Sequence, residues 1–411
     1  MKILHVNYSD INGGAAFVCN RLHTSLLKIN LDSWLLVNEK LASIDNTIGI
    51  NSNREVTIHK IKKIIAKEIT KLCGAKNKYS DSIAFFNSNL IKRINSINPD
   101  LVNLHWICNE MISIEQIAKI KKPLVWTLMD MWPFCGAEHY ATDNRFLEGY
   151  NKNNKPLDTK FIDINRWVWN RKKKILDFDF NIVCISKWLA NRAKESMLFK
   201  NKKISVINPN IDINEWKPID KQSARKILNF ELNKKYLVFS AFNGTNDFRK
   251  GFDIFLRAIE ILKINKNDLH LIIIGDANSK NLINSGIKYT SHKIYYSNTF
   301  SLRLLYSASD LLVAPSRQEA FGQVATEAGS CETPSIVFKN TGLEDIVDHK
   351  INGYLANYLS FEDLALGIEW SLDDVNNYKI GKNARKKVID NFSTDVIANK
   401  YKKLYLDLIH H

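Results

Sequence analysis

The chain has 411 residues, which is too long for one ordinary hydrophobic core, so two domains of about 200 residues each are expected. Its 45% hydrophobic and 25% charged residues are typical of a globular protein and exclude a disordered or fibrous one. The formal net charge of +15 indicates an acidic partner, either nucleic acid, an anionic membrane or a phosphate-bearing substrate. Because no zinc-finger spacing or RNA-recognition signature accompanies the charge, we do not expect nucleic acid.

Cysteine spacing and hydropathy bear on the compartment. The cysteines lack the spacing of a metal site or a disulfide framework, which predicts reduced thiols in a cytosolic protein. There is no run of 18 apolar residues, and MKILHVNYSD leads into a strand rather than the apolar region of a signal peptide. We therefore expect a cytoplasmic protein, soluble or peripheral on the inner face of the cytoplasmic membrane.

The chain opens with a strand, a glycine-rich turn and a helix. Ile3–Val6 is apolar, residues 10–16 read DINGGAA, and a helical stretch follows from Ala16 to Ile29. This order is typical of the phosphate-handling end of doubly wound α/β domains. Gly13 and Gly14 can either contact a ligand or simply allow a turn with positive φ, and the pattern leaves both interpretations open.

Residues 54–73 form a basic amphipathic stretch, REVTIHKIKKIIAKEITKLC. Its isoleucines recur near a helical period, with lysines between them. A helix that packs its isoleucines on the core and exposes its lysines is the favoured interpretation. The alternative is a helix that lies on an anionic bilayer.

Two further strands are expected at Leu101–Trp106 and Leu124–Leu128. In a doubly wound sheet, the loops after parallel strands meet at the ligand-binding edge. His105 and residues 127–140, TLMDMWPFCGAEHY, therefore become candidate site residues. For His105 alone, a structural histidine with satisfied hydrogen bonds is the alternative.

The polar, proline-containing residues 208–220 predict an interdomain linker. Beyond it, the strand at Tyr236–Ala241 leads into NGTNDFRKG and a helix at Phe252–Leu262. Arg249 and Lys250 stand beside a glycine at a helix start, which suits a diphosphate. The apolar strand that ends at Gly275 and a further strand and loop at Lys293–Phe300 are expected near the nucleotide.

The stretch from Leu311 to Ala328, LLVAPSRQEAFGQVATEA, predicts a buried strand, a loop and a helix that begins near Phe321. Glu319 lies in the loop, and Glu327 lies roughly 9 Å along the helix axis from its start. The free amides that follow Ala320 would face an anion, because helix N-termini favour phosphate. Two glutamates on a solvated helix face are the simpler alternative.

The segment SRQEAFGQVATEAGSCETPSIVF resembles the E(x7)E motif of retaining GT-B glycosyltransferases of family 4. The resemblance implies that Glu319 holds donor-sugar hydroxyls, that Glu327 holds the ribose, and that Lys250 binds the diphosphate with Arg249 as a helper. Donor contacts are implied for the residues around the helix start and for one glycine of the loops: Ala320, Phe321, Gly322, Gln323 and Gly275. Glu332 replaces a usual glycine of the motif.

The segment TLMDMWPFCGAEHY resembles TLHDMWPFTGGCHY of the bacterial polysaccharide branch of that family, which also carries an HW pair. The resemblance implies acceptor contacts for His105, Trp106, Met129, Asp130 and His139, and a phosphate or acceptor contact for the glycine loop, with Gly14 favoured. Asp130 joins Glu319 and Lys250 as a catalytic candidate. Met129 replaces a family histidine, and a thioether cannot exchange a proton. Activity is still favoured, because the departing diphosphate can take the acceptor's proton.

The resemblance thus implies a GT-B fold of two doubly wound Rossmann-like domains. Residues 1–212 would bind the acceptor, with the helix 397–411 packed back on them, and residues 213–396 would bind the donor. The implied function is metal-independent retaining transfer from a UDP- or GDP-sugar, without another cofactor, to a lipid-linked oligosaccharide for O-antigen, capsule or exopolysaccharide. The alternatives are a noncatalytic nucleotide-sugar-binding subunit and a sugar-nucleotide epimerase. Contact with an anionic membrane would use Arg54–Cys73.

Overall fold

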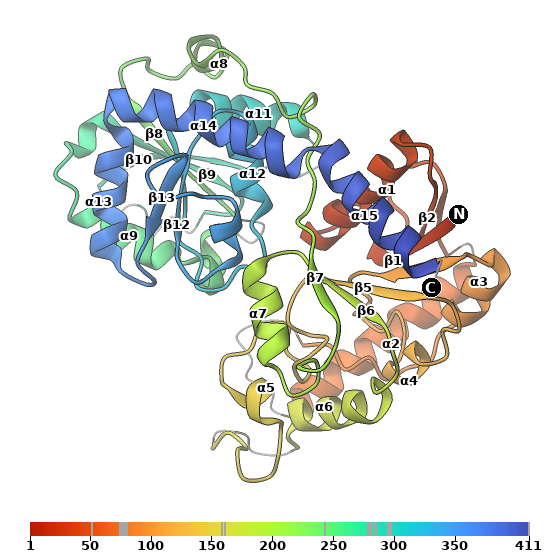
Figure 1. Ribbon diagram of the computed structural model, residues 1–411. Coiled ribbons are helices and arrows are strands. Elements are labelled where there is room, and N and C mark those ends of the chain that lie inside the picture. Colours follow the sequence, from red (N-terminus) through yellow and green to blue (C-terminus); the bar gives the residue numbers. More distant parts are fainter. Residues whose placement is uncertain are drawn as a thin grey trace. The chain divides into compact units, whose positions relative to one another are not determined.

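The computed structural model describes residues 1–50, 52–73, 81–157, 159, 162–241, 244–277, 282, 286–293 and 298–409. These form two compact units (Figure 1). The first consists of Met1–Asn208 together with the residues from Ala398 onward, and the second is Pro209–Ile397. The boundary between them falls inside the stretch expected as a linker.

A parallel sheet of seven strands organises the first unit, in the order β3-β2-β1-β4-β5-β6-β7. The strands are β1 (Lys2–Ser9), β2 (Asp32–Glu39), β3 (Thr47–Ile48), β4 (Leu101–Leu104), β5 (Leu124–Leu128), β6 (Asn181–Cys184) and β7 (Ile204–Val206). The helices are α1 (Gly14–Lys28), α2 (Asn53–Leu72), α3 (Leu90–Ile97), α4 (Ile114–Ile117), α5 (Arg145–Glu148), α6 (Ile164–Ile175) and α7 (Lys187–Glu195). The strand order reverses between β1 and β4, so the loops that follow these two strands turn toward opposite faces of the sheet and flank a crevice.

A six-stranded parallel sheet, in the order β10-β9-β8-β11-β12-β13, organises the second unit. The strands are β8 (Lys235–Ser240), β9 (Leu269–Ile274), β10 (Lys288–His292), β11 (Leu311–Ala314), β12 (Ser335–Phe338) and β13 (Gly353–Ala356). The helices are α8 (Lys221–Ile227), α9 (Phe252–Glu260), α11 (Thr299–Ala308), α12 (Gln323–Ser330), α13 (Phe361–Leu372) and α14 (Asp374–Phe392). Here the strand order reverses between β8 and β11. The prediction of two doubly wound α/β domains is confirmed.

The apolar composition of the inner strands explains both sheets. Strands β4, β5, β11 and β12 are buried along their whole length, as expected for parallel strands covered by helices on both faces. The last helix, α15 (Thr394–Ile409), brings two tyrosines to the first sheet. The Tyr405 hydroxyl accepts a hydrogen bond from Asn103 Nδ2 at 2.7 Å, and the Tyr401 hydroxyl lies 3.4 Å from Thr127 Oγ1. All six cysteines are buried free thiols.

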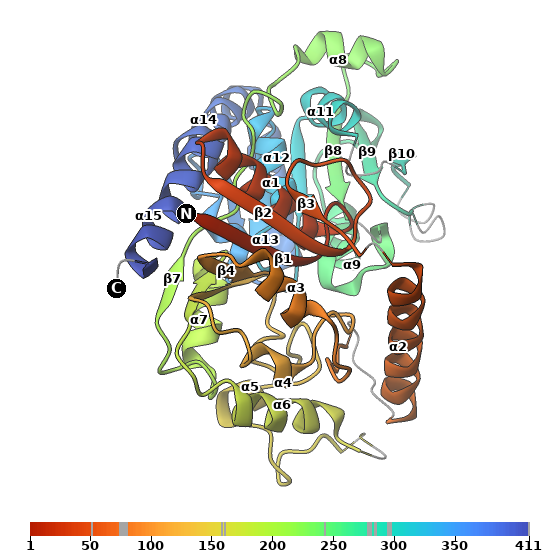
Figure 2. The same ribbon diagram turned by 90° about the vertical axis from the view of Figure 1, so that its right-hand side faces the viewer.

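Helix α2 contradicts the favoured interpretation of residues 54–73. Its only buried residue is Ala66, while Ile61, Ile64 and Leu72 are 50%, 62% and 75% exposed. Figure 2 shows the helix standing away from the sheet of its own unit. The expectation of a core-facing helix is therefore wrong. No helix in the described part of the chain is long and apolar enough to span a bilayer.

Two element boundaries also differ from the expected ones. The strand placed at Lys293–Phe300 lies earlier, at Lys288–His292, and residues 294–297 are outside the described residues. Helix α12 begins at Gln323 rather than near Phe321, because Gly322 takes a left-handed conformation with φ of 99° that a helix cannot continue.

Candidate functional site

A buried carboxylate between two cations marks the point where the strand order of the second unit reverses. Lys250 Nζ donates to Glu319 Oε2 at 2.5 Å, and Arg249 Nη1 lies 3.5 Å from the same oxygen. Arg249 and Lys250 come from the loop after β8, and Glu319 comes from the loop after β11. The fold therefore brings together three of the residues that the sequence singled out.

Charge keeps Glu319 ionised in this position. Burial by itself would raise the pKa of the carboxyl, but the positive charges of Lys250 and Arg249 outweigh it and hold the pKa below its usual value. A buried ionised carboxylate beside two cations is suited to recognise hydroxyl groups and to leave the cations close to an incoming anion.

Two glycines shape the turn that presents Glu319. A Cβ on Gly322 would stand 2.1 Å from Leu343 Cδ2, and a Cβ on Gly342 would stand 2.3 Å from the Ala320 carbonyl oxygen. The Gly342 amide also donates to the Glu319 carbonyl at 2.8 Å. The backbone around Ala320 is thus packed closely against the loop after β12, and only glycine permits that approach.

The remaining donor-side candidates contribute in different ways. Phe321 is buried with its ring 5.6 Å from that of Phe392, so only its backbone can face a ligand. Glu327 lies within α12, is buried, and stands one helical turn beyond Gln323, the first residue of that helix. Gly275 has φ of 121° and ends β9 against the Ala241 carbonyl, which places the loop after β9 beside the loop after β8.

The sequence analysis did not indicate Arg317, which connects the loop after β11 with the loop after β8. Its guanidinium donates to both Asp253 carboxylate oxygens at 2.8 and 2.6 Å and to the Phe248 carbonyl at 2.7 Å. It also lies over the Phe248 ring at 3.7 Å. Burial would raise the Asp253 pKa, but the pairing with Arg317 lowers it overall. The only sequence signal was an arginine next to the Pro-Ser break, which alone is too common to interpret.

The acceptor-side candidates of the first unit form a second polar cluster. His139 Nδ1 lies 2.6 Å from Asp130 Oδ2, and His139 Nε2 lies 2.9 Å from Ser82 Oγ. Trp106 Nε1 donates to the same Asp130 oxygen at 2.9 Å, and its indole stacks on the His139 ring at 5.4 Å. Asp130, His139 and Trp106 are thus brought together, and Ser82 is a further member that the sequence did not indicate.

Two other acceptor candidates are placed differently. His105 is 2% exposed, and its Nε2 lies 2.9 Å from His5 Nδ1 in the interior of the unit. Burial lowers its pKa to about 3, so the ring is neutral at pH 7. Met129 is also buried, at the end of β5. Neither side chain lies on the exposed surface of the first unit.

The glycine turn follows β1, the strand that pairs with β4. Gly13 has φ of 95° and precedes α1, whose first residue is Gly14. A Cβ on Gly13 would meet no atom within 4 Å, so its positive φ, rather than crowding, is the local reason for glycine. Both glycines lie in the segment after β1, whose end contacts the loop after β4: the Tyr8 amide donates to the Trp106 carbonyl at 2.9 Å.

A buried lysine fixes the loop that carries Asp130 and His139. Lys172 Nζ donates to the carbonyls of Trp132, Cys135 and Gly136, and it lies over the Trp132 ring at 3.8 Å. Burial lowers the Lys172 pKa to about 7. All three N–H bonds of the ammonium are used, so this side chain replaces the solvent that three inward-pointing carbonyls would otherwise need.

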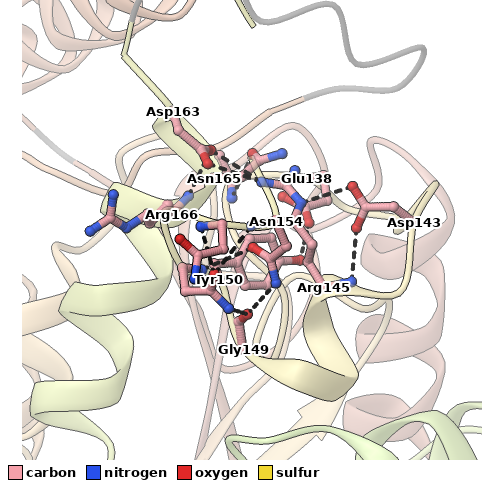
Figure 3. Close-up of polar contacts among 12 residues, drawn as sticks. Glu138, Asp143, Arg145, Gly149, Tyr150, Asn154, Asp163, Asn165 and Arg166 are labelled. Atoms are coloured by element: carbon pink, nitrogen blue, oxygen red, sulfur yellow. Dashed lines mark hydrogen bonds and ion pairs between the residues drawn. The ribbon is translucent and has the colours of Figure 1, made fainter. Parts of the chain in front are cut away.

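Polar contacts continue on the far side of the same loop (Figure 3). Glu138 accepts a hydrogen bond from the Tyr150 hydroxyl, and burial raises the Glu138 pKa to about 7. Arg145 pairs with Asp143 at 2.8 Å and with Asp163 at 3.1 Å. These contacts tie Glu138 to the segment after α5 and tie α5 to the start of α6.

Comparisons with known proteins agree with the fold and relate the second unit to a known family. Residues 220–387 match the model of the family Glycosyl transferases group 1. That region contains Arg249, Lys250, Glu319 and Glu327. The chain is thus related to group 1 glycosyltransferases through its second unit.

Curated relatives support the same relationship over part of their length. A D-inositol 3-phosphate glycosyltransferase of Segniliparus rotundus is 31% identical over 38% of this chain and 36% of its own. An uncharacterized glycosyltransferase of Methanocaldococcus jannaschii is 28% identical over 48% of this chain and 52% of its own. The capsular polysaccharide biosynthesis glycosyltransferase CapM of Staphylococcus aureus is 26% identical over 38% of this chain and 42% of its own. The chain therefore spans about a third to a half of the relatives that it matches.

Solved structures resemble the whole chain. A sucrose-phosphate synthase from Thermosynechococcus elongatus has a TM-score of 0.71 at 15% identity, and each chain is covered completely. HepE of Anabaena, solved in complex with UDP and glucose, has a TM-score of 0.64 at 17% identity, with 98% of this chain and 99% of the other covered. At these identities the likeness shows the fold alone, and that fold is GT-B.

The lowered pKa of Glu319 makes its contribution to stability depend on pH. A carboxyl whose folded pKa is depressed stabilises the fold above its unfolded value of about 4.3, and this contribution is lost as the pH falls further. We expect Glu319→Gln to lower the thermal midpoint by at least about 2 °C at pH 7, and by less near pH 3.5. Thermal unfolding followed by circular dichroism, with the exposed Glu260→Gln as the control, measures this. A difference that stays constant over this pH range would contradict it.

Removing the Lys172 ammonium should disrupt the Asp130–His139 loop. We expect Lys172→Met to destabilise the first unit by at least about 3 kcal/mol, because three buried carbonyls lose their donor. Urea unfolding followed by tryptophan fluorescence measures the loss. The neighbouring exposed Lys174→Met is the matched control and should unfold like the wild type. Equal stability of the two variants would show that water replaces the ammonium without cost.

Proposed function

We propose that the protein is a metal-independent, retaining glycosyltransferase that moves a sugar from a nucleoside diphosphate, UDP or GDP, to a surface-polysaccharide acceptor. The observation that carries this proposal is the contact of Glu319 with Lys250 and Arg249 at the strand-order reversal of the second unit. A doubly wound sheet binds its ligand at such a point. The match to a glycosyltransferase family model over the same residues supports a nucleotide-sugar as that ligand.

The charges of the site suit the departure of a nucleoside diphosphate. As the glycosidic bond breaks, negative charge develops on the diphosphate oxygens, and preorganised cations stabilise this charge most where water is excluded. Lys250 and Arg249 would supply the positive charge. Glu319 would release Lys250 to the diphosphate and accept hydrogen bonds from hydroxyls of the donor sugar.

The first unit supplies groups suited to an acceptor hydroxyl. Asp130 and His139 form a hydrogen-bonded pair beside the half-buried Trp106, and an indole face suits the apolar face of a sugar ring. A surface-polysaccharide acceptor is favoured by the resemblance of this motif to the bacterial polysaccharide branch, and the capsular relative is consistent with it. An acceptor linked to a lipid would be presented at an anionic membrane.

Helix α2 offers a surface for that membrane. Its exposed isoleucines and Leu72 lie among the lysines of the same helix, and they are not covered by other described residues. A helix of this composition inserts its apolar side at the level of the lipid headgroups, while its lysines meet anionic lipid. We therefore include peripheral contact of Arg54–Cys73 with an anionic bilayer in the proposal.

Donor consumption tests the proposed reaction. Purified protein would be incubated with UDP-, GDP- and ADP-sugars and a lipid-linked oligosaccharide extract, with and without EDTA. We expect transfer from one donor that survives EDTA and falls at least about 100-fold in Glu319→Ala, the size of effect seen when one preorganised transition-state contact is removed. The exposed Glu260→Ala is the control and should keep full turnover.

Two results would contradict the transferase proposal, and a third would contradict the role of Glu319 in it. Tight nucleotide binding without product from any donor would indicate a noncatalytic subunit, with Met129 as the mark of lost catalysis. Conversion of the donor into another sugar nucleotide without an acceptor would indicate an epimerase. Equal turnover of Glu319→Ala and wild type would show that Glu319 does not take part in the reaction.

Vesicle binding tests the membrane contact separately. We expect the protein to cosediment with phosphatidylglycerol vesicles but not with phosphatidylcholine vesicles, and to be released at high salt. The double variant Ile61→Glu, Ile64→Glu should bind at least about tenfold more weakly, since burying each isoleucine contributes about 1.5 to 3 kcal/mol. Leu366→Glu, at an exposed apolar position of α13, should bind like wild type. Equal binding of the double variant would exclude α2 as the membrane surface.

A further inference from the structure

Helix α2 turns polar side chains toward its own unit and isoleucines away from it. Surface helices normally do the opposite, because they bury their apolar side. Ile61 and Ile64 are 50% and 62% exposed. The contacts with the rest of the unit come from one stripe of positions at helical spacing: Glu55, His59, Lys62, Lys63 and the buried Ala66.

Polar contacts, rather than buried apolar area, therefore hold α2 in place. Asn89 Nδ2 donates to Glu55 Oε1 at 2.8 Å, and Lys62 Nζ donates to the Asn87 carbonyl at 2.6 Å. Both contacts are exposed to solvent, and Ala66 is the only buried residue of the helix. Water can replace such contacts at little cost. We therefore expect α2 to be one of the less stable elements of the unit, which a bound surface can restrain.

Lys63 connects α2 with the end of β1. Its Nζ donates to the Tyr8 hydroxyl at 2.6 Å and lies 3.6 Å from Glu39 Oε1. An ammonium can only donate, so the hydroxyl accepts there and gives its own hydrogen to the same Glu39 oxygen at 2.6 Å. Tyr8 is buried, and its ring lies 5.7 Å from the His59 ring of α2. The position of the Tyr8 side chain thus depends on α2.

Tyr8 in turn borders Trp106, which belongs to the Asp130 cluster. The two rings are nearly perpendicular, at 82°, with their centroids 5.8 Å apart. The indole also stacks on the His139 ring and donates through Nε1 to the Asp130 carboxylate. Tyr8, His139 and Asp130 together limit the orientations of the indole. Displacement of Tyr8 would therefore give the indole room to turn away from Asp130.

The two sides of α2 can be engaged at the same time. Ile61 and Ile64 are exposed while Lys63 holds Tyr8, so a bilayer can take up these isoleucines without breaking the Lys63 contact. A bilayer that restrains α2 also restrains Tyr8, and through it Trp106. A site that is already ordered loses less conformational freedom when a sugar binds.

We propose that α2 couples membrane contact to acceptor binding. Through Lys63 and Tyr8 the helix positions Trp106, so docking of α2 on an anionic bilayer strengthens the binding of a glycan at the Asp130 cluster. This coupling rests on the proposed function and names a regulation of its acceptor site. Lys63 and Tyr8 are positioning residues, because they act through Trp106. Since coupling is reciprocal, the glycan strengthens bilayer binding by the same factor.

The mutual effect of the two ligands tests the coupling without a donor or turnover. The probes are phosphatidylglycerol vesicles and the oligosaccharide pool released from lipid-linked material by mild acid. We expect a saturating amount of the oligosaccharide to strengthen cosedimentation of the whole chain with these vesicles at least about fivefold, the lower end of common coupling factors.

Substitutions of Lys63 and Tyr8 separate positioning from charge. Lys63→Met should bind the vesicles equally with and without the oligosaccharide, because α2 no longer holds Tyr8. Lys60→Met, at an exposed position of the same helix, removes the same charge and should keep the wild-type factor. Lys63→Arg can still donate to Tyr8 and should recover part of the coupling. Tyr8→Phe keeps the ring but loses the hydroxyl, so it should lose the coupling as Lys63→Met does.

The outcomes separate this coupling from the proposed reaction. Wild-type vesicle binding that does not respond to the oligosaccharide would overturn the coupling. A Lys63→Met variant that keeps the wild-type factor, or the same strengthening on phosphatidylcholine vesicles, would also overturn it. Failure of the proposed function appears elsewhere, as absent donor turnover or turnover insensitive to Glu319→Ala.

Where transfer occurs, kinetics give a second readout of the coupling. Phosphatidylglycerol vesicles should lower the apparent KM of the wild type for the released oligosaccharide at least about fivefold and leave kcat within about twofold. The KM of Lys63→Met should not respond to the vesicles. A merely structural role of Lys63 would instead change stability and leave the response of KM to vesicles intact.

Discussion

The buried Glu319 carboxylate and its two cations are the interaction on which the second unit's site depends. The Glu319 carboxylate would be unfavourable there without its cations, because burial disfavours the ionised carboxyl and an unpaired buried charge costs several kcal/mol. Their pairing fixes the loop after β8 against the loop after β11, and Arg317 joins the same two loops through the Phe248 carbonyl and also pairs with Asp253 of α9. The site is therefore preorganised, and a ligand has only to exchange partners within it.

In the first unit, buried cations also fix a loop. The loop that carries Asp130 and His139 turns three carbonyls inward, where no strand or helix can satisfy them, and Lys172 supplies all three donors. The contacts around Glu138, Tyr150 and Arg145 support the loop from its other side. In both units, a loop with no regular backbone pairing is held in one conformation by charged side chains that the neighbouring helices bury.

Helix α2 links three features of the first unit that are separate in sequence. Its isoleucines are exposed, its Lys62 contacts the segment that leads into α3, and its Lys63 contacts the residue whose ring neighbours Trp106.

The alternation of apolar strands with helical segments predicted an α/β fold with parallel sheets, and the resemblance to GT-B glycosyltransferases narrowed it to two doubly wound domains and indicated Glu319, Lys250, Asp130 and His139. The sequence could not show that α2 leaves its isoleucines exposed, since periodicity records an apolar face but not what covers it. Ser82, Arg317 and Lys172 contact residues that are far away in the chain. His105 is buried because it contacts His5, which is also distant in sequence. Only the tertiary structure decides such contacts, because they depend on which loops the strand order brings together.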